Sequence, residues 1–217
     1  MPLSLIIGLG IGCIAVVIGL VIRYEKKRRE GFQRVAQELG LPFYPKGDDA
    51  LLNTLNGFPL FSQGRSRKMK NLLYGQIDDG DVAVFGYRYT TRSGENSTTF
   101  RQNVVYFRSS DMDLPRFTLR PEHMFHRIGS VMGYQDIDFD SHPNFSKRYL
   151  LRGDDENAIR ATFTDAILTF FESQNRICIE AGGDQLIFYR TMKRVKPHEV
   201  VAFLEEASRA LKQFKTS

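Results

Sequence analysis

The sequence predicts an α+β domain behind an N-terminal transmembrane helix, with a mainly antiparallel sheet and a C-terminal packing helix. Residues 3–22 carry no charge. The middle of the chain has short alternating segments separated by turn signals, and its last stretch repeats apolar residues at helical spacing. We expect a transmembrane anchor over 1–22, a basic juxtamembrane helical stalk over 23–40, and a cytoplasmic α+β domain over 41–217.

The anchor is the clearest segment, because Ser4 is its only polar side chain between residues 3 and 22. Twenty helical residues span about 30 Å, which matches the hydrocarbon core of a bilayer. A cleaved signal peptide fits less well, since no Lys or Arg precedes residue 23 and the apolar run is too long. The sequence therefore predicts an uncleaved membrane anchor.

A basic flank follows the anchor, and no basic residue precedes it: Arg23, Lys26, Lys27, Arg28 and Arg29. This asymmetry predicts a single-pass protein with its C-terminal side in the cytoplasm. We expect the flank to lie against anionic headgroups of the lipid bilayer, at about 1 kcal/mol per basic residue.

The flank also explains the sequence pI of about 9.2. From residue 30 on, 25 basic residues face 24 acidic ones, so the domain is nearly neutral and no nucleic-acid partner is expected. Cys13 lies in the anchor and Cys178 in an apolar run, so the sequence predicts no disulfide framework.

Small residues recur on one face of the anchor at Gly8, Gly12, Ala15 and Gly19. Such a stripe lets two membrane helices approach closely, and it predicts a homodimer through the membrane helix. The alternative is that glycine is simply common in membrane helices.

The stalk is expected to end near Gly40, and Asp48 or Asp49 to cap a short helix. Asp79-Gly80 and residues 93–96 predict hairpin turns. The strands expected around them are Phe58–Ser62, Asn71–Ile77, Val82–Thr91 and Thr98–Arg108. We expect Ala83, Phe85, Tyr87 and Tyr89 to alternate onto one apolar face of this sheet.

Further elements are expected in the second half of the chain. They are a helix opened by Pro121 and closed by Gly133, a strand over Arg148–Leu151, a helical region from Asp154 to Ser173 broken near Thr164, a hairpin of Arg176–Glu180 with Gln185–Arg190, and a helix from Pro197 with the apolar stripe Val200, Leu204, Ala207, Leu211 and Phe214. About seven strands closed by a C-terminal helix also suit a pleckstrin-like barrel, which stays open as the alternative fold.

The block from Gln135 to Glu156, QDIDFDSHPNFSKRYLLRGDDE, resembles a stretch in uncharacterised bacterial proteins with one N-terminal membrane span. Leu119–Glu122 and Tyr87–Thr91 are similar too, and the resemblance covers most of residues 30–214. It implies a protein of the bacterial inner membrane. It carries no activity, cofactor or site residue.

The acidic segment Asp136, Asp138, Asp140 and His142 is the candidate metal site. Together with the Gly182-Gly183-Asp184 turn it looks like the two metal motifs of diguanylate cyclases. Gln185 and Leu186 stand where that family has an acidic residue and phenylalanine. The alternative is a capped loop and an ordinary hairpin turn.

Other chemistry has little support in the sequence. Gly-x-Ser-x-Gly and Walker loops are absent, Cys178 is expected in the core, and no cofactor is expected. The segment Arg65–Lys70 predicts a basic loop that could touch headgroups or an acidic partner. The leading hypothesis is a membrane-tethered, non-enzymatic interaction or ligand-sensing module with an unknown protein partner. The alternative is a membrane-face enzyme, or a degenerate nucleotide-binding domain, using the Asp136–His142 cluster.

Overall fold

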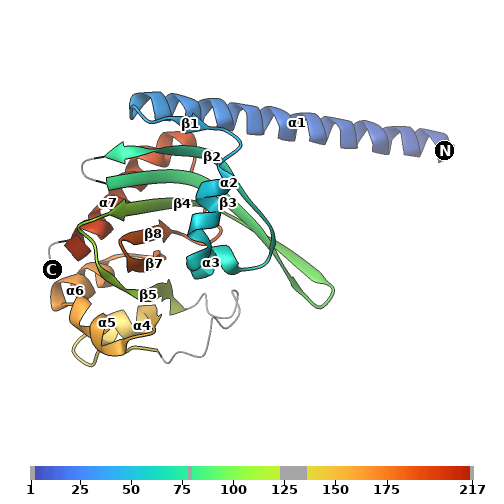
Figure 1. Cartoon of the computed structure of the whole chain (residues 1–217). Coiled ribbons are helices and arrows are strands. Elements are labelled where there is room, and N and C mark those ends of the chain that lie inside the picture. Colours follow the sequence, from blue (N-terminus) through green and yellow to red (C-terminus); the bar gives the residue numbers. More distant parts are fainter. Residues whose placement is uncertain (1–2, 78–79, 123–135, 216–217) are drawn as a thin grey trace.

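The computed structural model describes residues 3–77, 80–122 and 136–215, with side chains from Ile14 on. The helices are α1 (Leu3–Glu38), α2 (Asp49–Thr54), η1 (Leu55–Gly57), α3 (Pro59–Ser62), α4 (Pro143–Arg148), α5 (Glu156–Thr162), α6 (Asp165–Ser173), η3 (Pro197–Glu199) and α7 (Val200–Lys215). The strands are β1 (Phe43–Tyr44), β2 (Arg65–Ile77), β3 (Gly80–Ser93), β4 (Asn96–Ser109), β5 (Leu114–Pro121), β6 (Tyr149–Gly153), β7 (Cys178–Gly183) and β8 (Gln185–Tyr189). The α+β class and the C-terminal helix are confirmed (Figure 1).

The described strands form one sheet of eight, in the order β1-β2-β3-β4-β8-β7-β5-β6, and every pair in it is antiparallel. Among these strands β1 and β6 are the two edges and do not pair with each other, so the sheet is open. The alternative of a pleckstrin-like barrel was therefore wrong. Local turns alone do not close a sheet, which also needs hydrogen bonds between its first and last strands.

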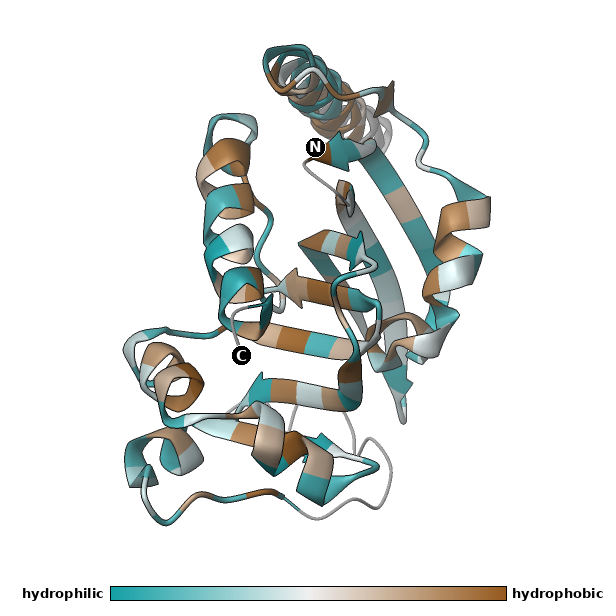
Figure 2. Cartoon of the chain, turned by 60° about the vertical axis from the view of Figure 1, so that its left-hand side comes forward, coloured by the Kyte–Doolittle hydropathy of each residue, from teal (hydrophilic) through white to brown (hydrophobic). Residues whose placement is uncertain are grey.

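The two faces of the sheet carry separate cores. On one face, Phe32 of α1 and Phe203 and Leu211 of α7 pack over Val84 and Val105 of the central strands. On the other face, α2, η1 and α3 cover an aromatic row that runs along β3. Figure 2 shows α7 and the α2–α3 segment on opposite sides of the sheet.

Several local predictions are confirmed. The Asp48 side chain accepts a hydrogen bond from Leu51 N at 3.0 Å and caps α2. Gly94 turns the β3–β4 hairpin with a φ of +58°, and Ser93 pairs with Asn96. The apolar stripe of the last helix is buried. Each of these features depends on neighbours a few residues apart, which a sequence displays directly.

Other local predictions were wrong. The segment expected as a strand over Phe58–Ser62 instead holds the short helix α3, Pro59–Ser62, with Pro59 in its first turn. The basic segment Arg65–Lys70 belongs to strand β2 rather than a loop. The helix α5 is capped by Asp155 rather than Asp154. Pro121 is the last residue of β5, and Glu122 directly after it lies in a 3-10 turn. The expected helix up to Gly133 lies outside the described residues.

Candidate functional site

The stalk half of α1 is packed onto the sheet (Figure 1). Phe32, Val35 and Ala36 are buried in the same core as α7. Gly31 lies so close to Pro197 that an added Cβ would come within 2.6 Å of the Pro197 Cγ atom. The stalk is therefore a fixed part of the folded body, and its orientation sets the direction in which the rest of α1 leaves the domain.

The five residues of the basic flank do not share one environment. Arg23, Lys26, Lys27 and Arg29 are exposed, whereas Arg28 is only 5% exposed. Its Nη2 donates to Asn103 Oδ1 at 3.1 Å, and its guanidinium lies 4.8 Å from the centre of the Phe32 ring. Burial and the nearby Arg194 lower the pKa of Arg28, against a smaller opposite effect of Tyr24 and Glu25. Arg28 thus points toward the domain, whereas the other four side chains of the flank are exposed.

Asn103 joins three elements at this junction. Its Oδ1 accepts from Arg28 and also from the backbone N–H of Val195, at 2.9 Å. One residue earlier on the same loop, Arg194 Nη2 donates to Glu25 Oε1 of the stalk at 2.9 Å. The stalk, strand β4 and the loop after β8 are therefore held together by polar contacts between residues far apart in the sequence.

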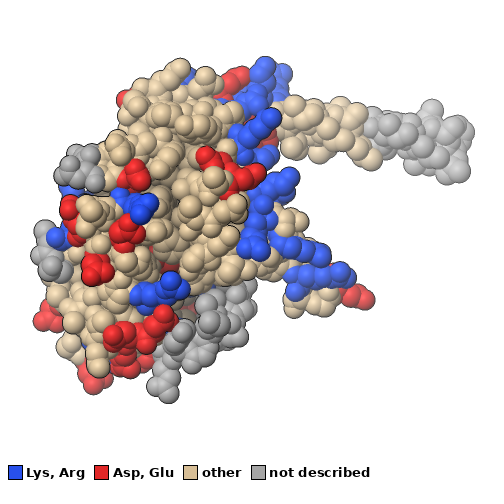
Figure 3. Space-filling model, viewed as in Figure 1, with Lys and Arg blue, Asp and Glu red and all other residues tan. Residues whose placement is uncertain are grey.

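A pocket of about 220 Å³ lies at this junction. It is lined by Glu25, Arg28, Lys68, Lys70, Asn71, Gly86, Tyr87, Arg88, Arg101, Gln102, Asn103 and Arg194. Six of these residues are basic and one is acidic, so the pocket favours an anion. Figure 3 shows Lys and Arg side chains gathered in a band from the stalk toward the protruding β3–β4 hairpin.

The other half of α1 projects away from the domain (Figure 1). Its large apolar side chains between Ile14 and Ile22 are 54–63% exposed. Ala15 and Gly19 of the small-residue stripe are exposed as well, while Gly8 and Gly12 fall in the part of α1 whose side chains are not described. The homodimer stays a prediction. In the part of the chain that the structure describes, no helix meets the length and apolarity needed to cross a membrane.

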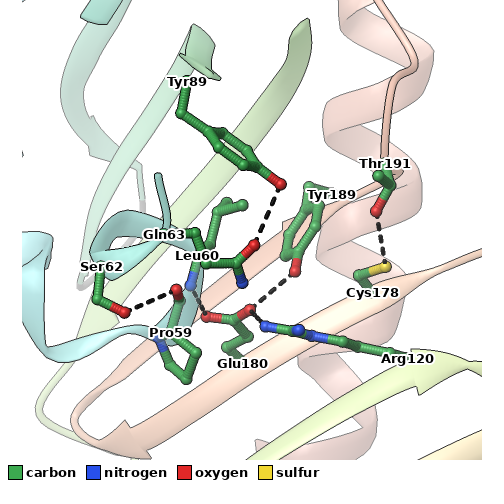
Figure 4. A network of polar contacts seen from close by, with 10 residues as sticks. All are labelled: Pro59, Leu60, Ser62, Gln63, Tyr89, Arg120, Cys178, Glu180, Tyr189 and Thr191. Atoms are coloured by element: carbon green, nitrogen blue, oxygen red, sulfur yellow. Dashed lines mark hydrogen bonds and ion pairs between the residues drawn. The ribbon is translucent and has the colours of Figure 1, made fainter. Parts of the chain in front are cut away.

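A second polar site lies on the opposite face of the sheet, beneath α3 (Figure 4). Glu180 is fully buried on β7. Its Oε1 accepts from Arg120 Nη2 at 2.6 Å and from the Tyr189 hydroxyl at 2.8 Å, and its Oε2 accepts from Leu60 N at 2.9 Å. Burial raises the pKa of Tyr189 well above its usual value, so the phenol stays protonated and donates. The carboxylate is thereby paired on both oxygens, and it fixes α3 to the sheet.

Two further contacts border this network. The Tyr89 hydroxyl donates to Gln63 Oε1 at 3.2 Å, and Cys178 Sγ lies 3.6 Å from Thr191 Oγ1. Burial raises the pKa of the Cys178 thiol to about 11, so it is protonated at neutral pH and unsuited to nucleophilic attack. A pocket of about 360 Å³ lies beside the network, between the α2–α3 segment and strands β5–β7. Glu180 was not predicted from the sequence, where its signal is a charge within an apolar strand.

The acidic segment does not assemble as a metal site. Asp136 Oδ1 accepts from Leu151 N at 2.9 Å, and burial and Asp138 raise the pKa of Asp136. Asp138 and Asp140 are exposed, and His142 lies between Glu172 and Asp165, 3.3 Å from a carboxylate oxygen of each.

Across residues 3–77, 80–122 and 136–215 no three His, Cys, Asp or Glu side chains are placed to hold a metal ion. In the sequence His123 and His126 are also spaced for one face of a helix, which would suit a metal site, but both lie outside the described residues. At the Gly182-Gly183 turn, Asp184 accepts from Arg108 Nε at 2.6 Å instead of joining Asp136. The two acidic motifs therefore do not meet: Asp136 accepts from a backbone N–H, and Asp184 accepts from an arginine.

Comparison with known proteins gives one informative result. No protein-family model matches the chain, and no curated protein matches it. Among solved structures, the chain is similar to the mycobacterial trehalose monomycolate transport factor A, TtfA, with a TM-score of 0.62 and 15% sequence identity. The match covers 89% of this chain and 94% of the other. At this identity the likeness shows a shared fold.

Proposed function

We propose that this chain is a membrane-tethered, non-enzymatic interaction or ligand-sensing module of the bacterial inner membrane. Residues 3–22 act as its single-pass anchor, and the α+β domain lies on the cytoplasmic side, where it meets a protein partner. The carrying observation is that α1 is one continuous helix whose C-terminal half is packed in the domain core while the apolar side chains between Ile14 and Ile22 stay exposed.

The physical argument starts from that exposure. A contiguous exposed apolar surface on a folded protein marks a place that is covered by lipid or by another protein. The run without charge extends back to residue 3 in the sequence, and the basic flank begins directly after Ile22. Both features support the bilayer as the covering medium, with the domain on the side of the basic flank.

The structural neighbour supports the non-enzymatic part of the proposal. That protein is a trehalose monomycolate transport factor. A transport role fits a module that holds or relays something at a membrane better than it fits an enzyme. The proposed membership in a bacterial family with one N-terminal span agrees with this role.

Anchoring is tested by washing membranes that contain the full chain with alkaline carbonate. We expect the wild-type chain to stay in the membrane pellet. Ile14→Arg combined with Ile18→Arg should release it, because each arginine near the middle of a span costs about 3 kcal/mol. The matched control, Ile14→Leu with Ile18→Leu, should stay in the pellet. Recovery of the wild-type chain in the wash would overturn the anchor.

Orientation is tested with reporters fused after Ser217. A reporter that works only in the cytoplasm should be active there, and one that works only in the periplasm should be inactive. The reverse pattern would place the domain on the other side of the membrane.

The rival enzyme is tested through the acidic segment. If Asp136, Asp138, Asp140 and His142 hold no ion, magnesium, manganese, calcium or zinc should leave the melting temperature of the full chain unchanged. An ion at 100 times its dissociation constant would add about 2.7 kcal/mol of stability. A shift of several degrees that disappears in the Asp136→Asn, Asp138→Asn variant would favour metal-dependent chemistry instead.

A further inference from the structure

Three cations lie in one row across three neighbouring strands. Lys68 of β2 is opposite Arg88 of β3, and Arg88 is opposite Arg101 of β4. Directly opposite residues of antiparallel strands point to the same face, with Cβ atoms about 5 Å apart, and like charges in such pairs are destabilising. In the described part of the chain none of the three forms an ion pair with an acidic side chain. Among the described residues, therefore, no acidic side chain pairs with this row of cations.

The neighbouring row of residues forms the rest of the base of the pocket. Lys70, Gly86 and Asn103 are opposite one another on the same three strands. Gly86 has no side chain, so the middle of this row stays open between its two neighbours. Arg28 of the stalk and Arg194 of the loop after β8 line the same pocket, and the only acid there, Glu25, is already paired with Arg194.

Among the described residues, four that line this pocket have a buried polar atom without a hydrogen-bond partner: Arg28, Tyr87, Gln102 and Asn103. Tyr87 and Gln102 are opposite each other on the alternate positions of β3 and β4, so the two donors on the side of the stalk are those of Arg28 and Asn103. Within the described residues, Arg28 Nε and Asn103 Nδ2 have no hydrogen-bond partner. Their residues are 5% and 0% exposed, and both line the pocket. A buried donor without a partner is costly, and a ligand with several acceptor oxygens would satisfy both. Phosphate offers such oxygens, and arginine matches its geometry with paired N–H groups.

The position of the pocket along α1 indicates where the phosphate comes from. Arg28 is six residues beyond Ile22, about 9 Å farther along a helix. If residues 3–22 span the hydrocarbon core, this distance places the pocket at the level of the lipid headgroups. The basic band in Figure 3 lies where the projecting half of α1 meets the domain.

We propose that this pocket binds the phosphate group of an anionic phospholipid, held by Arg28, Lys68, Arg88 and Arg101. The proposal rests on the proposed membrane anchoring for the source of the phosphate, and it gives the ligand-sensing module a ligand class. A single lipid headgroup would then neutralise the row of cations and accept hydrogen bonds from the unpaired donors beneath the stalk. Because Arg28 belongs to the stalk, the bound lipid would also help to set the angle of the stalk.

The test uses the full chain in micelles of an uncharged detergent. It is titrated with dihexanoyl phosphatidylglycerol, with dihexanoyl phosphatidylcholine and with inorganic phosphate, and binding is followed by calorimetry and by melting temperature. We expect phosphatidylglycerol to bind at least about tenfold more tightly than either other probe. Equal or tighter binding of inorganic phosphate would overturn the lipid source. Absence of binding by all three would overturn the site.

Matched variants separate the pocket from the general basic character of the flank. Arg88→Gln with Arg101→Gln removes two pocket charges, and Arg23→Gln with Lys27→Gln removes two exposed flank charges. The pocket variant should bind phosphatidylglycerol at least about tenfold more weakly, and the flank variant within about twofold of wild type. An equal loss of affinity in both variants would mean that phosphatidylglycerol is held by unspecific charge attraction, and it would overturn the proposed pocket.

The melting temperature without ligand shows whether the pocket variant is still folded. Removing charges from the repelling row should leave the melting temperature of the pocket variant equal to or above that of wild type. A lower melting temperature would contradict the repulsion on which the site is built.

Carbonate extraction distinguishes this inference from the proposed function. The pocket variant should remain in the membrane pellet like the wild type. A wild-type chain that leaves the membrane contradicts the anchoring, whereas an anchored pocket variant with unchanged lipid affinity contradicts the phosphate site.

Discussion

Glu180 beneath α3 and Arg28 beneath the stalk are both buried charged side chains on opposite faces of the sheet, and their surroundings differ. Beneath α3, the Glu180 carboxylate accepts from Arg120, Tyr189 and the backbone of Leu60. Beneath the stalk, Arg28 makes one hydrogen bond to Asn103, and its Nε has no partner in the described part of the chain. Burial alone therefore does not distinguish a structural charge from one that is proposed to bind a ligand.

Glu180 and Arg28 differ in their own hydrogen-bond pairing, although Arg120 Nε beside Glu180 also lacks a partner among the described residues. A buried charge that is fully paired holds its neighbours in one arrangement, and removing it leaves those neighbours unpaired. A buried charge with an unpaired donor destabilises the protein without ligand, and a ligand that accepts from this donor offsets the cost. Substitution of Glu180 should therefore mainly lower the stability of the fold, and substitution of Arg28 should mainly weaken ligand binding.

The largest effect is expected for Glu180→Ala. This change leaves Arg120 as a buried unpaired cation and leaves the Tyr189 hydroxyl and Leu60 N without their acceptor. The free energy of unfolding of the full chain in micelles, measured with urea, should fall by about 3–5 kcal/mol. Glu205→Ala, at an exposed position of α7, should change it by no more than about 0.5 kcal/mol. A loss below about 1 kcal/mol for Glu180→Ala would show that the network does not hold α3.

A smaller effect is expected for Tyr189→Phe, which removes one of the donors to Glu180 and leaves the other two. The free energy of unfolding should fall by about 1–2 kcal/mol. Because both substitutions act on the same network, the double variant with Glu180→Ala should be no less stable than Glu180→Ala alone. Additive losses would mean that the tyrosine acts outside the network.

Arg28→Met sharpens the comparison from the other face. Methionine keeps an apolar stem over Phe32 and removes a charge that is poorly compensated, so the free energy of unfolding should stay within about 1 kcal/mol of wild type. Binding of phosphatidylglycerol should weaken at least about tenfold in the same variant. A stability loss as large as that of Glu180→Ala would make Arg28 a structural residue.

The smallest effect belongs to the exposed pair of Asp184 and Arg108. The hydrogen bond from Arg108 lowers the pKa of Asp184 below its usual value of 3.8. The pair therefore contributes stability above that value and loses it as the pH falls through the lowered pKa. Asp184→Asn should flatten the pH dependence of unfolding below the usual Asp pKa of 3.8, by less than any change above, because solvent screens the pair. An unchanged pH profile would show that the Arg108–Asp184 pair does not contribute to the stability of the fold.

The sequence by itself determined the features that depend on close neighbours. The uncharged run, the Asp48 cap, the turn at Gly94 and the stripe of α7 are each fixed by residues within a few positions of one another. Their spacing matches the period of a helix or a turn, so they were predictable from the printed letters. The same reasoning gave the antiparallel character of the sheet, since hairpin turns join strands in opposite directions.

Only the tertiary structure decided which residues meet across the sheet. Strand register placed Lys68, Arg88 and Arg101 in one row, although 13 to 33 positions separate them in the sequence. Folding also brought Glu180 under Leu60, and Arg28 onto Asn103, across 120 and 75 positions. Pro59 suits the first turn of α3, but the acceptor that holds the Leu60 N–H, Glu180, belongs to the distant strand β7. The pairing of distant strands is fixed by global packing, and both polar sites exist only after that packing is complete.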